Sequence, residues 1–389
     1  MCPAMNRPHN LSRRVFVGAA AGALGLPWLA AACGGQTNTA LGPGPVAQKK
    51  MGTLLGFGEA DKSHFFIGAV DLDATGRPVR EQRDINFLGH GFAPNPQKPH
   101  LAVISQKHGR GAVEWDMRAR KVTRGLDIPP GRQFYGHGAF TPDGKTLFLV
   151  ESVVGDKSYD GVISVRDGDS YEITGHFPSY GLAPHDVLLI DDGRMLVITN
   201  GGGLIGTDEL PCVTYVDVKT RELKRKLTFT SPRINAGHLA MTSRGDLVVI
   251  SAPREGLDVE AADVHGAISF YSPGGEVRTP DHSVLRRMRR ETLSAAIHEP
   301  TMTVCATSPY GNMVTFWDFR RAALIKAIDE FVMPRGVSLT LDGRYFALTY
   351  DQATHAVLID ARSLEVARET TVDQTFISGS HNYIYEMPL

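Results

Sequence analysis

The sequence is poor in cysteine and in aromatic residues, and it has no excess of either charge. Only four of its 389 residues are cysteine, and no two are spaced as CxxC, so a thiolate zinc site is not expected. Lysine and arginine number 41 against 42 acidic residues, and aromatic residues make up 8%. These values predict neither a basic patch nor a stacking surface, so we expect no nucleic-acid partner.

Several motifs of common enzyme classes are also absent. The sequence has no GxSxG elbow, no Walker A loop and no HExxH helix. The run Asn200-Gly201-Gly202-Gly203 follows an expected strand and opens no helix, so it is not a dinucleotide fingerprint. We interpret Cys212 and Cys305, which lie in apolar runs of different repeats, as buried thiols rather than a disulfide.

The N-terminal residues 1–33 have the pattern of an export signal. The paired Arg13 and Arg14 are followed by Phe16, which resembles the twin-arginine motif and predicts transport of the folded protein to the periplasm. The apolar stretch that follows is about 18 residues long and contains Pro27, which argues against a transmembrane anchor.

The end of this segment predicts a lipid anchor. Ala30-Ala31-Ala32-Cys33 resembles a lipoprotein processing site at which Cys33 would be lipidated, although Leu29 lies one place too far from the cysteine. Ordinary cleavage after Ala-x-Ala is the alternative. Residues 34–50, rich in Gly, Pro, Ala and Thr, are expected to form a flexible linker to the membrane.

The remaining chain repeats. An alternating apolar run that ends in Asp, or once in Ser, recurs seven times, at intervals of 45, 51, 50, 55, 46 and 42 residues; the final residues of these runs are Asp71, Asp116, Asp167, Asp217, Ser272, Asp318 and Asp360. Turns suited to hairpins precede the later runs, as at Asp143-Gly144 and Asp342-Gly343. Units of this length with short strands predict an all-β, seven-bladed β-propeller of the WD40/YVTN type, filling residues 51–389 as one domain.

The two ends of the repeat predict how the ring closes. The first unit lacks a strand before Thr53–Phe57, and the C-terminal run Asn382–Met387 is one strand too many. We expect that run to be the innermost strand of the first blade, because an open ring would leave strand edges unpaired. The basic run Arg286–Arg290 is interpreted as a solvated loop between blades rather than a second domain.

Five of the 14 histidines occupy one position of the repeat, where the first strand of a blade begins beside the central channel; they are His90, His137, His185, His238 and His381. The other two units place Thr292 or Leu293 and Arg335-Gly336 there. By the symmetry of a propeller, these side chains would ring one mouth of the channel. Several imidazoles together suit Cu, Zn or Fe.

The loops after each second strand would open on the same face. They are expected to bring polar groups to the channel mouth, namely Glu59, Lys107, His108, Glu151, Asn200, Arg254, Glu255, Tyr310, Tyr350 and Asp351. Arg335, at a histidine position, suits an anion.

A structural role for the histidines is the alternative, since Gly-His pairs at this position stabilise WD-type blades by packing and hydrogen bonding. Three of the five histidines follow glycine, whereas His185 and His381 do not, so these two are the better ligand candidates.

Three segments carry a family resemblance. GHGAFTPDGKTL from Gly136, YDGVISVRD from Tyr159 and FPSYGLAPHDVLL from Phe177 resemble a group of periplasmic propellers defined only as a domain of unknown function. TSPYGN from Thr307 fits as well. Members of that group are often encoded beside imelysin-like iron-uptake lipoproteins and di-haem oxidoreductases. The resemblance implies a periplasmic role linked to iron or another transition metal, and it supplies no catalytic residues.

The sequence therefore favours an accessory protein of metal uptake. It would be a monomer that binds a transition metal, or a metal-carrying partner such as an imelysin-like protein, at the histidine-rich mouth. A propeller enzyme of the lactonase or copper-oxidase kind and an interaction scaffold with structural histidines remain alternatives.

Overall fold

The computed structural model describes residues 50–387 except 75–79, 155–159 and 352–353. These residues belong to one compact unit, Gln48–Leu389. The predicted export signal with Arg13, Arg14 and Cys33, and the linker up to residue 49, lie outside the described residues. Within the described part, no helix has the length and apolar character needed to cross a bilayer.

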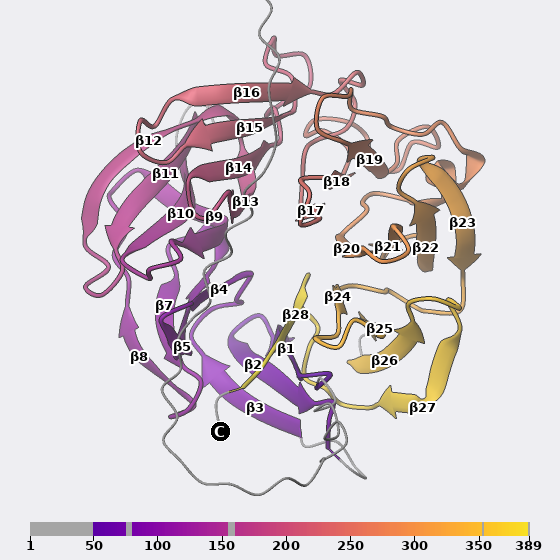
Figure 1. The fold of residues 1–389 in the computed structure, drawn as a ribbon, viewed down its shortest axis with the longest axis horizontal. Helices are drawn as coiled ribbons and strands as arrows, with labels where there is room; N and C mark the ends of the chain where they lie inside the picture. The colour runs from indigo at the N-terminus through magenta and orange to yellow at the C-terminus, as the bar shows by residue number, and fades with distance from the viewer. Residues whose placement is uncertain (1–49, 75–79, 155–159, 352–353, 388–389) are drawn as a thin grey trace, which may run out of the picture. The chain divides into compact units, whose positions relative to one another are not determined.

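Seven antiparallel sheets stand around a common axis, which confirms the prediction of a seven-bladed propeller (Figure 1). Each blade is named here by its order in the chain, with its strands given from the axis outward. Blade 1 consists of β28 (Asn382–Tyr385), β1 (Thr53–Asp61), β2 (His64–Asp71) and β3 (Arg80–Ile85). Blade 2 consists of β4 (Gly91–Asn95), β5 (Lys98–Ser105), β7 (Ala112–Asp116) and β8 (Lys121–Gly125). Blade 3 consists of β9 (Arg132–Phe140), β10 (Thr146–Val153), β11 (Asp160–Asp167) and β12 (Ile173–Leu182).

The other four blades repeat this arrangement. Blade 4 consists of β13 (Pro184–Ile190), β14 (Met195–Asn200), β15 (Cys212–Asp217) and β16 (Leu223–Thr228). Blade 5 consists of β17 (Leu239–Met241), β18 (Leu247–Ser251) and β19 (Ala267–Tyr271). Blade 6 consists of β20 (Ser294–His298), β21 (Thr303–Ser308), β22 (Met313–Asp318) and β23 (Ala323–Ile328). Blade 7 consists of β24 (Val337–Leu339), β25 (Tyr345–Tyr350), β26 (His355–Asp360) and β27 (Val366–Val372).

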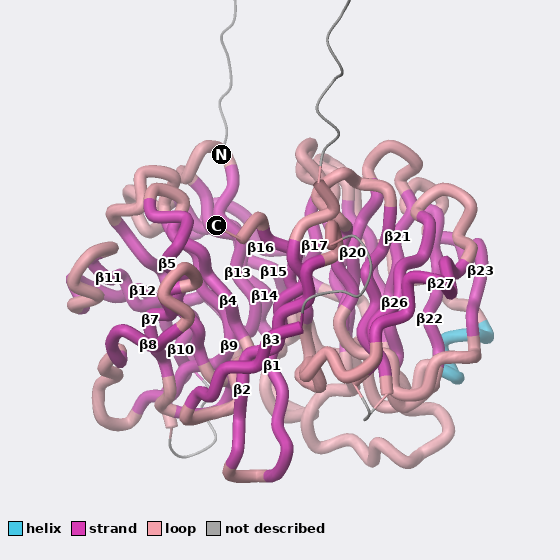
Figure 2. The backbone as a smooth tube through the Cα atoms, turned by 90° about the horizontal axis from the view of Figure 1, so that it is seen from below, coloured by secondary structure: helices cyan, strands magenta, loops and turns pink. Residues whose placement is uncertain are grey.

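The strands run between two faces made of turns and loops (Figure 2). The seven apolar runs counted in the sequence are the third strands of the seven blades. They and the second strands are mostly apolar on both sides because both of their faces are covered. In β18, for example, all five residues are buried.

The hydrophobic core is divided into seven clusters, one between each pair of neighbouring blades. Trp317 of blade 6, which is fully buried, packs with Phe270 of blade 5 in the largest of them. The cluster between blades 7 and 1 joins Leu358 to Leu54. The ring is therefore held closed by the same kind of contact that holds every other pair of blades.

The C-terminal strand completes blade 1, as predicted. β28 pairs antiparallel with β1, with Thr53 opposite Tyr385 and Gly56 opposite Asn382. Both ends of the ring thus meet in one sheet, which covers the inner edge of β1.

Two blades depart from the four-strand repeat in the described part of the chain. Blade 5 has no fourth strand; an irregular stretch with the 3₁₀ helix η1 (Ser283–Arg287) replaces it, and this stretch includes part of the basic run noted in the sequence. Blade 3 gains a fifth strand, β6 (Lys107–Gly109), which comes from the loop after β5 and pairs with β9. Cys212 and Cys305 are buried free thiols, as expected.

Candidate metal centre

The five histidines of the repeat converge on the axis of the ring. His90, His238 and His381 directly precede β4, β17 and β28, whereas His137 and His185 lie within β9 and β13. In nine of their ten pairs, the ring centroids lie between 4.0 and 5.6 Å apart. Five blades thus each contribute one imidazole to a single cluster.

His238 lies at the centre of this cluster. Its Nε2 atom is 2.6 Å from that of His185, 2.8 Å from that of His381 and 3.4 Å from that of His90. The ligand atoms of one subset, His90, His137, His238 and His381, all lie within 4.8 Å of one another. We call this subset the four-histidine set.

These separations fit a metal ion. With metal–nitrogen bonds of about 2.0–2.1 Å, adjacent ligand atoms lie about 2.9–3.4 Å apart and opposite ones about 4.1 Å apart. Small movements of the rings would bring four nitrogens to such positions around one ion. His185 stands beside the set and reaches it through His238. Of the two histidines without a preceding glycine, His381 belongs to the set and His185 does not, whereas the other three members of the set follow glycine.

The protonation state also suits metal binding. Burial, followed by repulsion from neighbouring imidazoles and Lys107, lowers the pKa of His90, His185, His238 and His381 well below the usual value. Burial lowers the pKa of His137 too, against the opposing effect of Asp186. At neutral pH all five rings are therefore neutral, and each has a lone pair for a metal ion.

The cluster does not satisfy its own hydrogen bonds. A neutral imidazole has one donor and one acceptor nitrogen. The Nε2 atom of His137 is buried and has no hydrogen-bond partner, whereas its Nδ1 atom lies 3.6 Å from Oδ1 of Asp186. A nitrogen left without a partner inside a group of imidazoles is the observation expected where a metal ion supplies the missing contact.

Hydroxyl groups of neighbouring blades fix the backbone beside the histidines. Ser105, at the end of β5, donates to the carbonyl of Gly136, directly before His137. Thr199 of β14 donates in the same way to Gly237, directly before His238. The Tyr383 hydroxyl donates to the carbonyl of His90 at 2.6 Å. The second strand of one blade thus positions the histidine of the next, and the closing strand positions the first.

Asp186 links three of the histidine-bearing segments, a role that the sequence analysis missed. Its Oδ2 atom accepts a hydrogen bond from the backbone of Leu239, next to His238, and its Oδ1 atom accepts one from Val187. The same carboxylate faces His137. A carboxylate behind a ligand histidine orients the ring and raises its basicity. Its position directly after His185 was the available signal.

Several charged side chains surround the cluster, among them Lys107, Glu291 and Arg335. Lys107 and Glu291 line a cavity of about 100 Å³ that reaches His185 and His238. Lys107 and Arg335 line a second cavity, of about 430 Å³, that reaches His90. Burial lowers the pKa of Lys107 and raises that of Glu291, and each partly offsets the effect on the other. Lys107 and Arg335 were predicted at this mouth, whereas Glu291 was not.

The other residues predicted at the mouth are engaged elsewhere. Glu151 is fully buried in an ion pair with Arg166, at 3.0 Å, and with Arg132, at 3.4 Å. Asn200 is fully buried and bonded to Ser179 and Thr214. Both correct the prediction, because the ends of second strands sink between blades and their polar groups find partners there.

Tyr310 and Asp351 line neither cavity beside the cluster. Tyr310 is exposed and lies 4.6 Å below the guanidinium of Arg290, measured to its ring centroid. The backbone of Asp351 donates to Val332.

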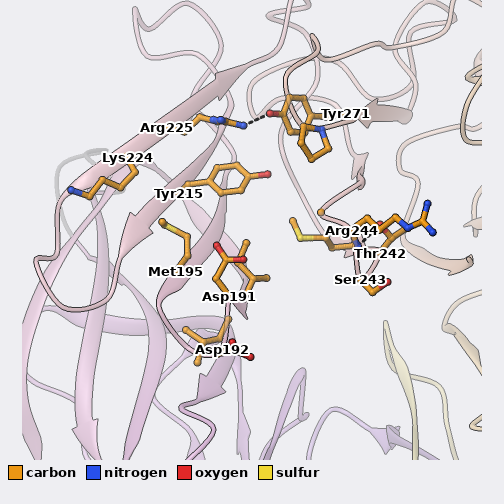
Figure 3. A pocket seen from close by; sticks show the side chains of 15 residues that line it. Asp191, Asp192, Met195, Tyr215, Lys224, Arg225, Thr242, Ser243, Arg244 and Tyr271 are labelled. Carbon is orange, nitrogen blue, oxygen red and sulfur yellow. Dashed lines mark hydrogen bonds between the residues drawn. The ribbon is translucent and has the colours of Figure 1, made fainter. Parts of the chain in front are cut away.

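A larger cavity, of about 640 Å³, lies between blades 4 and 5 at the far ends of the first strands. Figure 3 shows Arg225 directed at the hydroxyl of Tyr271, with Asp191 and Asp192 on the adjoining turn. No histidine lines it, and its walls carry both charge signs. This cavity is separate from the histidine cluster.

Comparison with known proteins supports the fold and the family. A chain titled "Kuenenia stuttgartiensis Hydrazine Synthase" matches with a TM-score of 0.59 and 14% identity, over 81% of this chain and 93% of that chain. At this identity the likeness concerns the fold alone. A search of curated proteins found no match. A family model described as "Protein of unknown function (DUF1513)" matches residues 84–376, and the chain therefore belongs to the DUF1513 family.

Proposed function

We propose that this protein is a periplasmic metal-binding propeller that holds one transition-metal ion in the four-histidine set and serves metal uptake as an accessory protein. The observation that carries the proposal is the meeting of four histidine ligand atoms within 4.8 Å at the axis. An all-imidazole donor set suits copper, zinc or iron and does not suit calcium or magnesium.

The position of the centre supports a binding role more than a structural one. Histidines that only packed blades together would each bond within their own blade interface. Here the backbone beside them is fixed by Ser105, Thr199 and Tyr383, while the rings point at one another. Five neutral rings in contact make few hydrogen bonds of their own, so a bound ion would stabilise the arrangement.

Metal analysis tests the proposal directly. Protein exported by a bacterial host and purified without chelators should contain close to one copper, zinc or iron ion per chain. The paired variant His238→Ala/His381→Ala should contain none, and the exposed His176→Ala should behave as the parent. A parent protein that contains no metal, and whose stability is unchanged by adding these ions, would refute the metal centre.

The role in uptake requires its own tests. The twin-arginine pattern supports export, so changing Arg13 and Arg14 to Lys should keep the protein in the cytoplasm. The family resemblance supports an imelysin-like partner for iron. Crosslinking in the periplasm followed by mass spectrometry should recover that partner, and cells without the gene should accumulate less iron in limiting medium. Normal metal content in such cells would count against the uptake role.

A metal-dependent enzyme is the second candidate. The cavity of about 430 Å³ that His90 shares with Lys107 and Arg335 favours it, because this space would let a small substrate approach the ion. Turnover of a lactone panel or of phenolic substrates with dioxygen, lost in His238→Ala/His381→Ala, would establish this activity.

A further inference from the structure

The strand β6 is built to place Lys107 beside the histidines. It is the extra strand that makes blade 3 the only five-stranded sheet among the described residues. His108 adopts a positive φ of 56°, and its ring packs on Tyr135 with centroids 4.5 Å apart. Left-handed backbone at a residue other than glycine costs free energy and persists where neighbouring contacts enforce it.

The rest of that loop is anchored to blade 3. The guanidinium of Arg110 donates to the carbonyls of Pro129 and Arg132, at 3.1 and 3.2 Å, and to that of Ile128. Gln106 accepts from the backbone of Gly111. Lys107 therefore takes its position from a fixed loop.

The ammonium of Lys107 has no direct partner there. Within the part of the chain that the structure describes, it makes neither a hydrogen bond nor an ion pair, although the side chain is partly buried. Glu291 acts on it through space but does not reach ion-pair distance. A partly buried ammonium without a partner has lost some of its hydration, so a ligand between it and the cluster would be stabilised.

The charges around the cluster point to an anion. Four neutral imidazoles would leave the full charge of a divalent ion uncompensated, and Lys107 and Arg335 add two further positive charges. The acidic groups that face this region are Asp186, Glu291, Glu255 and, at the outer rim with Lys62, Glu59. Asp186 is occupied by the backbone amides of Val187 and Leu239.

The smaller of the two cavities beside Lys107 suits a small anion. The cavity between Lys107, His238 and Glu291 has a volume of about 100 Å³. Since one water takes up about 30 Å³ in the liquid, this is room for an ion of three or four heavy atoms.

We propose that Lys107 holds a small anion, of the size of nitrite, bicarbonate or azide, on the metal ion of the four-histidine set. This inference rests on the proposed metal centre and adds a fifth, exchangeable ligand to it. The anion accepts hydrogen bonds from the ammonium of Lys107 and shields the metal ion from that charge.

Azide binding to the copper-loaded protein tests the proposal. Cu²⁺ is added to the full exported chain, its stoichiometry is measured, and azide is then titrated while the azide-to-copper charge-transfer band and the electron paramagnetic resonance spectrum are followed. The parent should bind azide saturably. Lys107→Met should bind it at least tenfold more weakly while still loading copper, Lys107→Arg should retain most of the affinity, and Lys62→Met should match the parent.

The outcomes separate this inference from the metal centre. Copper that loads but gives no azide band, or the same azide affinity in Lys107→Met as in the parent, would overturn the anion site and leave the metal centre intact. Failure of the parent to bind copper, zinc or iron would overturn both. If Lys107→Met is poorly folded, Lys107→Gln provides the same comparison with a polar side chain.

Discussion

Removing the central histidine should abolish most of the stabilisation that a metal ion gives. At an ion concentration 1,000 times the dissociation constant, a ligand that binds only the native state stabilises it by about 4.1 kcal/mol. The propeller, Gln48–Leu389, has roughly 340 residues, so its unfolding entropy near the midpoint is about 0.7 kcal/mol per kelvin. The metal should therefore raise the midpoint of the parent by about 6 °C.

His238→Ala removes the nitrogen that lies nearest to three others. Loss of a group behind a ligand weakens metal binding 10- to 100-fold, so loss of the ligand itself should cost at least about 100-fold. The same ion concentration is then only about 10 times the dissociation constant, which leaves about 1.4 kcal/mol, or about 2 °C.

Differential scanning fluorimetry of chelator-treated protein, with and without added ion, measures both shifts. The exposed His176→Ala controls for nonspecific binding and should keep the full shift. If the ion raised the unfolding midpoint of His238→Ala as much as that of the parent, His238 would not be a ligand, because the ion would then be held by other residues.

Three further results are expected. Chelator-treated protein should lose stability as the pH falls from about 7 to about 5, because the histidines take up protons in the unfolded chain, whereas burial lowers their pKa in the folded protein. Each buried histidine can lower the free energy of unfolding by up to about 1.4 kcal/mol per pH unit. Urea titrations measure this change, and a free energy of unfolding that does not vary with pH would contradict the prediction. Arg166→Met should cost about 3–5 kcal/mol because it leaves Glu151 short of a buried partner, whereas Arg233→Met, at an exposed pair, should cost less than about 1 kcal/mol by the same measurement. Burial raises the pKa of the Cys212 thiol to about 11 and raises that of Cys305 as well, so Ellman's reagent should label neither until the protein unfolds, and rapid labelling of the native protein would show the packing to be wrong.

The repeat itself was predictable because each blade has the same pattern of apolar and turn residues in the sequence. The final residues of the third strands, from Asp71 to Asp360, count the blades, and the unpaired run at Asn382 gives the closure. The histidines follow from the same register, since equivalent positions on a ring must converge. The symmetry of the ring therefore made the histidine cluster predictable from the sequence.

Side-chain contacts that do not recur from blade to blade were not predictable in this way. Glu151 was expected at the mouth, but its partner Arg166 lies on the next strand and draws the carboxylate into the core. Glu291 was not expected at the mouth but lies there, because it belongs to the irregular stretch of blade 5 and has no equivalent in the repeat. The strand β6 was not predictable either, because a segment of three residues that crosses from one blade to the next is too short to show a periodic pattern.

The closing strand gives the proposed metal centre a mechanical role. His381 directly precedes β28, and His90 precedes β4, so two ligands in mutual reach are separated by nearly the whole length of the propeller. An ion that binds both acts as a cross-link between the two ends of the chain, and a cross-link over a loop of this length restricts the unfolded ensemble strongly. The closing strand β28 would then leave the ring only after the ion is released. Conversely, a chain whose ends have not yet met lacks one of the ligands, so the ion can be bound tightly only by a ring that is already closed.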